Sequence, residues 1–214
     1  MDGLRVRVQY DSVSFFDSVP RPPRPPEIPR REPKPWDGPP AGWIAGWVPW
    51  RIVLLRSGDA HAVLRDFEAL PTGLQFSLVT TLRRDPMAHR GHHAPFFAPG
   101  EQGMRLGVAF ADGRKAVAGL DMNRETSRDP SQPVLRPGGG GGSGSTYRLS
   151  FWLWPLPPPG PLTWVAQWPE HNLAENSVNV DATVLAAAAS EAEQLWQVNP
   201  NELDRTTTRH VLGS

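Results

Sequence analysis

Three histidines in the segment AHRGHHAPFF form the only obvious concentration of functional side chains in the sequence: His89, His92 and His93. His89 and His93 are four residues apart, which on a helix would place both imidazoles on one face, where they could share a metal ion with His92. Gly91 and Pro95 oppose a helix here, and no HExxH motif or partner carboxylate stands at a recognisable spacing. We therefore interpret the segment first as a solvated polar loop, and alternatively as the metal site of a metal-dependent enzyme.

Two further segments contain residue types that are used in catalysis. The run GGGGGSGS at residues 138–145 has the glycine content of a phosphate-binding loop, but it lacks the Gly-Lys-Ser/Thr ending, so we expect a flexible loop between strands. Glu170 and His171 follow a predicted strand, and nothing fixes their distance to another catalytic group. No recognisable catalytic constellation is present, so we expect a non-enzymatic protein without a cofactor.

The segment WLWPLPPPGPLTW, residues 152–164, places tryptophans on both sides of a proline-rich corner. Its prolines cannot donate to a β-ladder, so they end one strand, and Pro-Gly-Pro turns the chain into the next. We expect Trp152 and Trp154 to stack across this corner on Trp164 or Trp168 and to belong to the core. The alternatives are that Trp152, Trp154 and Trp164 bind a partner, or that exposed tryptophans bind carbohydrate.

The elements around these residues alternate apolar and polar side chains, as short strands do. Strands are predicted at residues 50–55, 60–69, 74–83, 104–110, 114–120, 146–154 and 162–168. Turn residues between them include Asp112-Gly113, a strong hairpin signal. A helix is predicted at 181–196 with Asp181 as its N-cap. About seven strands at roughly ten-residue spacing, followed by one helix, indicate a mainly β protein. We expect an antiparallel β-sandwich with one C-terminal α-helix. The sandwich is immunoglobulin-like in strand spacing only.

The chain is expected to have a single sandwich domain at residues 43–196, preceded by an arm at 1–19 that contains a strand. Residues 20–42 are a proline-rich linker that should adopt extended polyproline II, and 197–214 should form a disordered tail. The linker is interpreted as a stiff spacer, and alternatively as a ligand for an aromatic groove. Its length would let the arm wrap its own domain or reach a second copy.

Composition excludes several classes of protein. The 214 residues contain no cysteine, which rules out disulfide scaffolds and cysteine-based metal sites or nucleophiles. The 22 basic residues balance 22 acidic ones, so we expect neither nucleic acid nor a membrane surface as a partner. No export signal or long apolar run is recognised, and we expect a cytoplasmic protein. Its partner would be an unidentified protein, or a second copy bound through the N-terminal arm.

Part of the chain resembles uncharacterised proteins of actinobacteria. The resemblance rests on the glycine run, FWLWPLPPPGPL, TWVAQWPEH and VDATVLAAAASEAEQLW, with PTGLQFSLVTTLR and MRLGVAFADGR before them, and covers residues 43–196. It implies a one-domain β fold and an actinobacterial source, and no activity. The expected function is therefore that of a non-enzymatic binding or assembly protein acting through a macromolecular partner, with the metal-dependent enzyme and the carbohydrate-binding module as alternatives.

Overall fold

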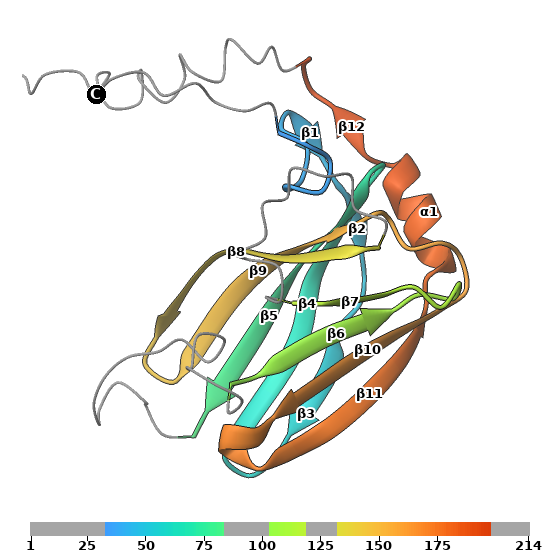
Figure 1. The fold of residues 1–214 in the computed structure, drawn as a ribbon. Coiled ribbons are helices and arrows are strands. Elements are labelled where there is room, and N and C mark those ends of the chain that lie inside the picture. Colours follow the sequence, from blue (N-terminus) through green and yellow to red (C-terminus); the bar gives the residue numbers. More distant parts are fainter. Residues whose placement is uncertain (1–32, 84–102, 119–131, 198–214) are drawn as a thin grey trace, which may run out of the picture. The chain divides into compact units, whose positions relative to one another are not determined.

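The computed structural model describes residues 33–83, 103–118 and 132–197 (Figure 1). All of them belong to one unit, which begins at Glu32. The protein is mainly β, with antiparallel sheets and one helix, as the sequence predicted. No helix among the described residues is long and apolar enough to cross a membrane. His89, His92 and His93, the predicted N-terminal strand and nearly all of the predicted tail at 197–214 lie outside the described residues.

The larger sheet has six strands in the order β2-β4-β5-β9-β8, with β3 also paired to β4 (Figure 1). Its strands are β2 Gly46–Val48, β3 Ile52–Arg56, β4 Ala60–Leu70, β5 Gly73–Leu82, β8 Val134–Ser143 and β9 Thr146–Trp154. Strands β4 and β5, predicted at residues 60–69 and 74–83, form a hairpin, and every pairing in this sheet is antiparallel. Because side chains alternate across each strand, one face of the sheet is apolar and the other is polar.

The smaller sheet has the order β11-β10-β6-β7. Its strands are β6 Arg105–Ala109, β7 Lys115–Val117, β10 Pro161–Trp168 and β11 Leu173–Asp181. The predicted Asp112-Gly113 hairpin joins β6 to β7, and Gly113 has a φ of 86°, which favours glycine. The Asp112 Oδ1 carboxylate accepts a hydrogen bond of 3.0 Å from the backbone N–H of Arg114.

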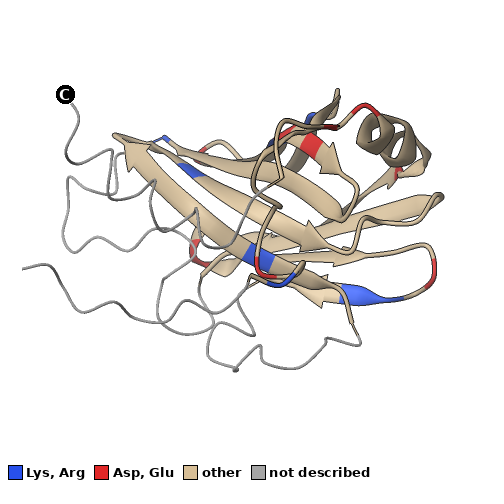
Figure 2. Ribbon diagram, turned by 90° about the horizontal axis from the view of Figure 1, so that it is seen from above, with Lys and Arg blue, Asp and Glu red and all other residues tan. Residues whose placement is uncertain are grey.

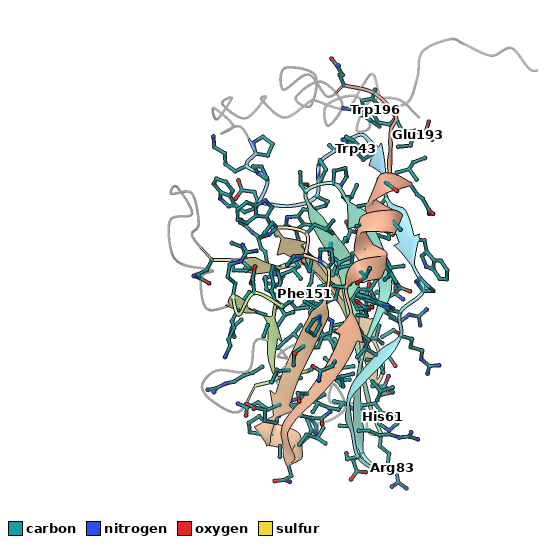
Figure 3. The ribbon with its side chains drawn as sticks, turned by 90° about the vertical axis from the view of Figure 1, so that its right-hand side faces the viewer. Trp43, His61, Arg83, Phe151, Glu193 and Trp196 are labelled. Carbon is teal, nitrogen blue, oxygen red and sulfur yellow. The ribbon has the colours of Figure 1, made fainter. Side chains whose placement is uncertain are left out.

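The core fills the space between the two sheets and is rich in aromatic rings. The ring centroid of Trp164 on β10 lies 4.9 Å from that of Phe76 on β5 and 6.0 Å from that of Phe67 on β4. The Phe151 ring stacks on Phe76 at 5.4 Å, and Figure 3 shows Phe151 in the interior. Burial of these rings accounts for much of the hydrophobic stabilisation of the fold.

The glycine run is a strand, which corrects the prediction of a flexible loop. Residues Gly138–Gly142 lie in β8 and pair with β9, with a register shift between Pro137 and Gly140. A Cβ on Gly140 would stand 2.8 Å from the Arg148 carbonyl oxygen, and one on Gly142 would stand 2.5 Å from the Tyr147 ring. The absence of side chains therefore lets β8 approach β9 closely, and this approach outweighs the low strand propensity of glycine.

The C-terminal helix is shorter than the predicted 181–196. Helix α1 covers Thr183–Ser190, and a short strand β12, Glu193–Gln194, then pairs with β1, Trp43–Ile44. Leu185, Ala188 and Ala189 form the buried face of the helix, whereas Trp196, the last residue of the predicted helix, is 61% exposed. Backbone pairing with β1 replaces the helical hydrogen bonds that residues 193–195 would have made.

Part of the predicted linker packs on the sandwich, so the folded unit begins before the predicted start at Trp43. Trp36 is buried, and its ring meets Trp154 edge-on at a centroid distance of 5.5 Å. The indole Nε1–H of Trp152 donates to the Pro35 carbonyl oxygen at 2.9 Å. Asp37 accepts a hydrogen bond of 2.9 Å from Arg136 Nη1 on β8. We call residues 34–37 the N-terminal knob, because they form a compact turn anchored to β8 and β9.

The Asp181 carboxylate, just before helix α1, links the stability of the fold to pH. The Asp181 carboxylate accepts hydrogen bonds from the Thr183 hydroxyl at 2.6 Å and from its backbone N–H at 2.9 Å. These bonds lower the pKa of Asp181 below its ordinary value of 3.8. Their contribution to stability is therefore complete above that value and is lost as the pH falls through the lowered pKa.

Asp181→Asn is accordingly expected to melt at a lower temperature than the parent at neutral pH, with a difference that narrows as acid protonates the parent's carboxylate. Thermal melts followed by circular dichroism over a pH series measure this. Glu175→Gln, which removes one exposed negative charge from β11, is the control. A difference between Asp181→Asn and parent that does not change with pH would contradict the prediction.

Candidate functional site

The structure distributes the sequence-predicted site residues over several environments. His89, His92 and His93 lie outside the described residues, so the metal site stays a prediction. In the part of the chain that is described, no group of three or more histidine, aspartate or glutamate side chains could hold a metal ion. Glu170 and His171 lie in a short 3-10 helix, where the imidazole of His171 packs against the buried Trp168 ring at 4.2 Å.

The tryptophans of the proline corner do not stack on one another across it, which corrects the predicted arrangement. Trp164 is fully buried between the sheets, and Trp152 is only 3% exposed. The reason is that β9 and β10 belong to different sheets, so the corner carries the chain between layers. Trp152 and the half-buried Trp154 instead hold the N-terminal knob. The two buried rings offer no surface to a partner in this structure.

A groove of about 620 Å³ lies on the outer, polar face of the larger sheet. Val63 on β4 and Val79 on β5 are paired directly and line it, and Val53 on β3 continues this apolar row. Trp47 lines the groove from β2 and is 67% exposed. Trp50 also lines it, and its ring packs edge-on against Phe67 at 5.4 Å. The groove therefore combines an apolar row with one fixed and one exposed indole.

Arginine side chains surround the apolar row. Arg51 and Arg65 line the groove together with His61, and Asp66 is the only carboxylate among the described residues that do so. Arg148 on β9 extends the row of Val63 and Val79. Further positive charge comes from Arg56, which pairs with His61 in the sheet. No described carboxylate forms an ion pair with Arg51 or Arg56, so this face carries a local excess of positive charge although the whole chain is neutral.

Asp66 occupies an irregular position in β4 that directs its side chain into this cationic group. The register between β4 and β5 shifts between Arg65 and Glu68, and Asp66 has a φ of 55°. Its Oδ1 lies 3.0 Å from Arg65 Nε, and its Oδ2 lies 3.0 Å from Arg148 Nη2. Bulges of this kind re-aim a side chain and often lie next to functional sites.

Sequence reasoning missed this site because its residues come from five strands, β2, β3, β4, β5 and β9, and from the segment between β2 and β3. The alternation of β4 does show that His61, Val63 and Arg65 share one face. It does not show that Trp47 and Arg148 lie near them, because that depends on the order of strands in the sheet. The sequence did offer one sign of this site: Trp47 shortly precedes a strand whose solvent-facing positions are His61, Val63 and Arg65.

Comparison of the chain with protein-family models, with curated proteins and with solved structures gave no match.

Proposed function

We propose that this protein is a non-enzymatic binding protein whose groove holds a short acidic and apolar segment of a partner protein. The observation that carries the proposal is the apolar row of Val63 and Val79 bordered by Arg51, Arg65 and Arg148 on one sheet face. An apolar side chain of the partner would cover the valines and Trp47, and its carboxylates would meet the guanidinium groups. Such complementarity gives specificity and fast association.

The ion pairs already present would not prevent this binding. Arg65 is 51% and Arg148 is 55% exposed at the side chain, and Asp66 is 36% exposed. The exposed pair of Arg65 with Asp66 Oδ1 is of a kind that contributes only about 0–1 kcal/mol, so a carboxylate of a partner can compete for Arg65 at little cost. The Asp66 Oδ2 atom is buried against Arg148, so that pair is retained. Arg51 and Arg56 have no described ion-pair partner to displace.

A peptide fits the groove better than a carbohydrate does. Sugars are held by dense hydrogen bonding around exposed aromatic platforms, whereas the apolar row of Val63 and Val79 offers no hydrogen bond, and the hydrogen-bonding side chains of this groove border that row. Trp50 packs against Phe67, which leaves Trp47 as the one strongly exposed indole in the described groove. The carbohydrate-binding alternative is therefore less well supported, and it becomes one outcome of the experiment.

The test is selection of a displayed library of random short peptides on the immobilised full-length protein, followed by fluorescence anisotropy with the enriched peptides. We expect peptides that combine Asp or Glu with aliphatic residues. Arg51→Glu/Arg65→Glu should weaken their binding by at least about tenfold. Arg105→Glu, a charge reversal at an exposed residue of β6 in the other sheet, should leave it unchanged. Enrichment of basic peptides, or heparin binding in place of peptide binding, would overturn the proposal.

Asp66→Asn gives an independent prediction in the opposite direction. Asparagine tolerates a positive φ and keeps the size of the side chain, but it no longer holds Arg65 and Arg148 through a negative charge. Affinity for the enriched acidic peptides should rise about two- to fivefold, consistent with loss of a competing exposed charge. Unchanged or weaker binding by Asp66→Asn would show that Asp66 does not compete with the ligand.

A further inference from the structure

A second exposed surface, which shares no residue with the groove, lies where β1 and β12 pair. We call residues 42–44 and 193–196 the terminal ribbon. Trp43 pairs with Gln194 and Ile44 with Glu193, and the Leu195 N–H donates to the Gly42 carbonyl oxygen at 2.8 Å, which continues the pairing by one residue. Figure 3 shows Trp43, Glu193 and Trp196 together at one end of the molecule, with His61 and Arg83 at the opposite end.

The terminal ribbon exposes apolar side chains to an unusual degree. Ile44 is 52%, Leu195 is 45% and Trp196 is 61% exposed. Because side chains alternate along paired strands, Ile44 and Leu195 share one face, and Trp43 and Trp196 fall on the other. A two-stranded ribbon is marginally stable in water unless something packs on it. Its exposed faces therefore indicate a binding surface.

The charge beside the terminal ribbon is negative. Glu191 and Glu193 are exposed on either side of the turn into β12, and Figure 2 shows acidic residues around the helix. Glu193 pairs with Ile44 and so lies on the face of Ile44 and Leu195, whereas Trp196 projects from the other face of the same strand. A basic proline-rich segment that runs along β12 can contact both side chains. Proline-rich chains dock on aromatic side chains in the preformed polyproline II conformation, which loses little entropy on binding.

The protein's own sequence contains such a segment. Residues 20–32 combine closely spaced prolines with four arginines and two glutamates: Arg21, Arg24, Arg30, Arg31, Glu27 and Glu32. We propose that this segment of one copy docks on the terminal ribbon of a second copy, with its arginines facing Glu191 and Glu193. Fully extended at about 3.1 Å per residue, it would span roughly 40 Å, enough to reach a neighbouring molecule.

The exchange would be reciprocal. Each copy offers one proline-rich segment and one terminal ribbon, so two identical contacts form around a two-fold axis and close the assembly as a dimer. Once the first contact has formed, the second becomes intramolecular and gains from a high effective concentration. The dimer contact uses none of the groove residues. Dimerisation and acidic-peptide binding can therefore be tested separately.

A charge-swap experiment on the full-length protein tests the proposal by sedimentation equilibrium. The parent should be dimeric. Glu191→Lys/Glu193→Lys and Arg30→Glu/Arg31→Glu should each dissociate at least tenfold more readily, because like charges then face each other in both contacts. An equimolar mixture of the two variants should restore the dimer as a heterodimer, because every contact again joins opposite charges. Glu175→Lys, on exposed β11, is the matched control and should remain dimeric.

Trp196→Ser provides a second test that leaves the backbone pairing of β1 with β12 in place, and it should also weaken the dimer at least tenfold. Circular dichroism of each variant checks that it is folded. A parent that is monomeric at its highest soluble concentration would overturn the proposal, as would charge-reversed variants that dimerise like the parent. A mixture that stays monomeric would overturn it as well. Acidic-peptide binding measured on the same variants distinguishes this failure from a failure of the groove.

Discussion

Replacing Trp164 with alanine is expected to lower the free energy of unfolding by about 3–5 kcal/mol. The Trp164 ring is fully buried and contacts Phe76 and Phe67, which come from the opposite sheet. Its removal would leave a cavity where the two sheets meet, and the flanking strands are too well paired to collapse into it. Urea denaturation of parent and variant measures the loss.

Trp47→Ala is the matched control for Trp164→Ala, because it deletes the same side chain from a site that is 67% exposed. We expect a change within about 0.5 kcal/mol. A Trp164→Ala variant that unfolds at the same urea concentration as the parent would contradict the packing of the two sheets described here.

Gly46→Ala is expected to destabilise the protein by about 3 kcal/mol or more, although it adds a single methyl group. A Cβ at Gly46 would lie 1.7 Å from the carbonyl oxygen of Ala188 and 2.6 Å from its carbonyl carbon. Both atoms are backbone atoms of α1, so no rotamer change can relieve the overlap. The helix would have to move away from β2, which would expose Leu185, Ala188 and Ala189.

Gly58→Ala controls for the general effect of replacing glycine, because a Cβ at Gly58 meets nothing within 4 Å. It should unfold close to the parent in urea. If Gly46→Ala also does so, α1 is not held against β2 as closely as the structure places it.

Much of the fold follows from local pattern. Strand β10 alternates Leu162, Trp164, Ala166 and Trp168 with more polar residues, and these four are the ones that face the core. The Asp112-Gly113 hairpin is also determined locally, because its turn needs one residue with a positive φ and Gly113 supplies it. Such elements are predictable because the residues that determine them are neighbours in the sequence.

Other elements depend on partners that are distant in the sequence. The glycine run has no side-chain pattern to indicate a strand, and it becomes one only because β9 lies alongside it. The helix ends at Ser190 because β1, about 150 residues earlier, offers backbone partners to the residues beyond it. The groove also depends on distant partners, because only the order of β2, β4, β5 and β9 in the sheet brings Trp47, Arg65 and Arg148 to the same face.

The N-terminal knob has a mechanical consequence. A pull on the chain ahead of residue 33 reaches the knob before it reaches β1, and the knob is fastened to the larger sheet by Trp36 on Trp154, by Pro35 on Trp152 and by Asp37 on Arg136. The force would therefore act first on β8 and β9, where it is distributed over the many hydrogen bonds of their antiparallel pairing. The short pairing of β1 with β12, which would otherwise unzip one bond at a time, is shielded from that force.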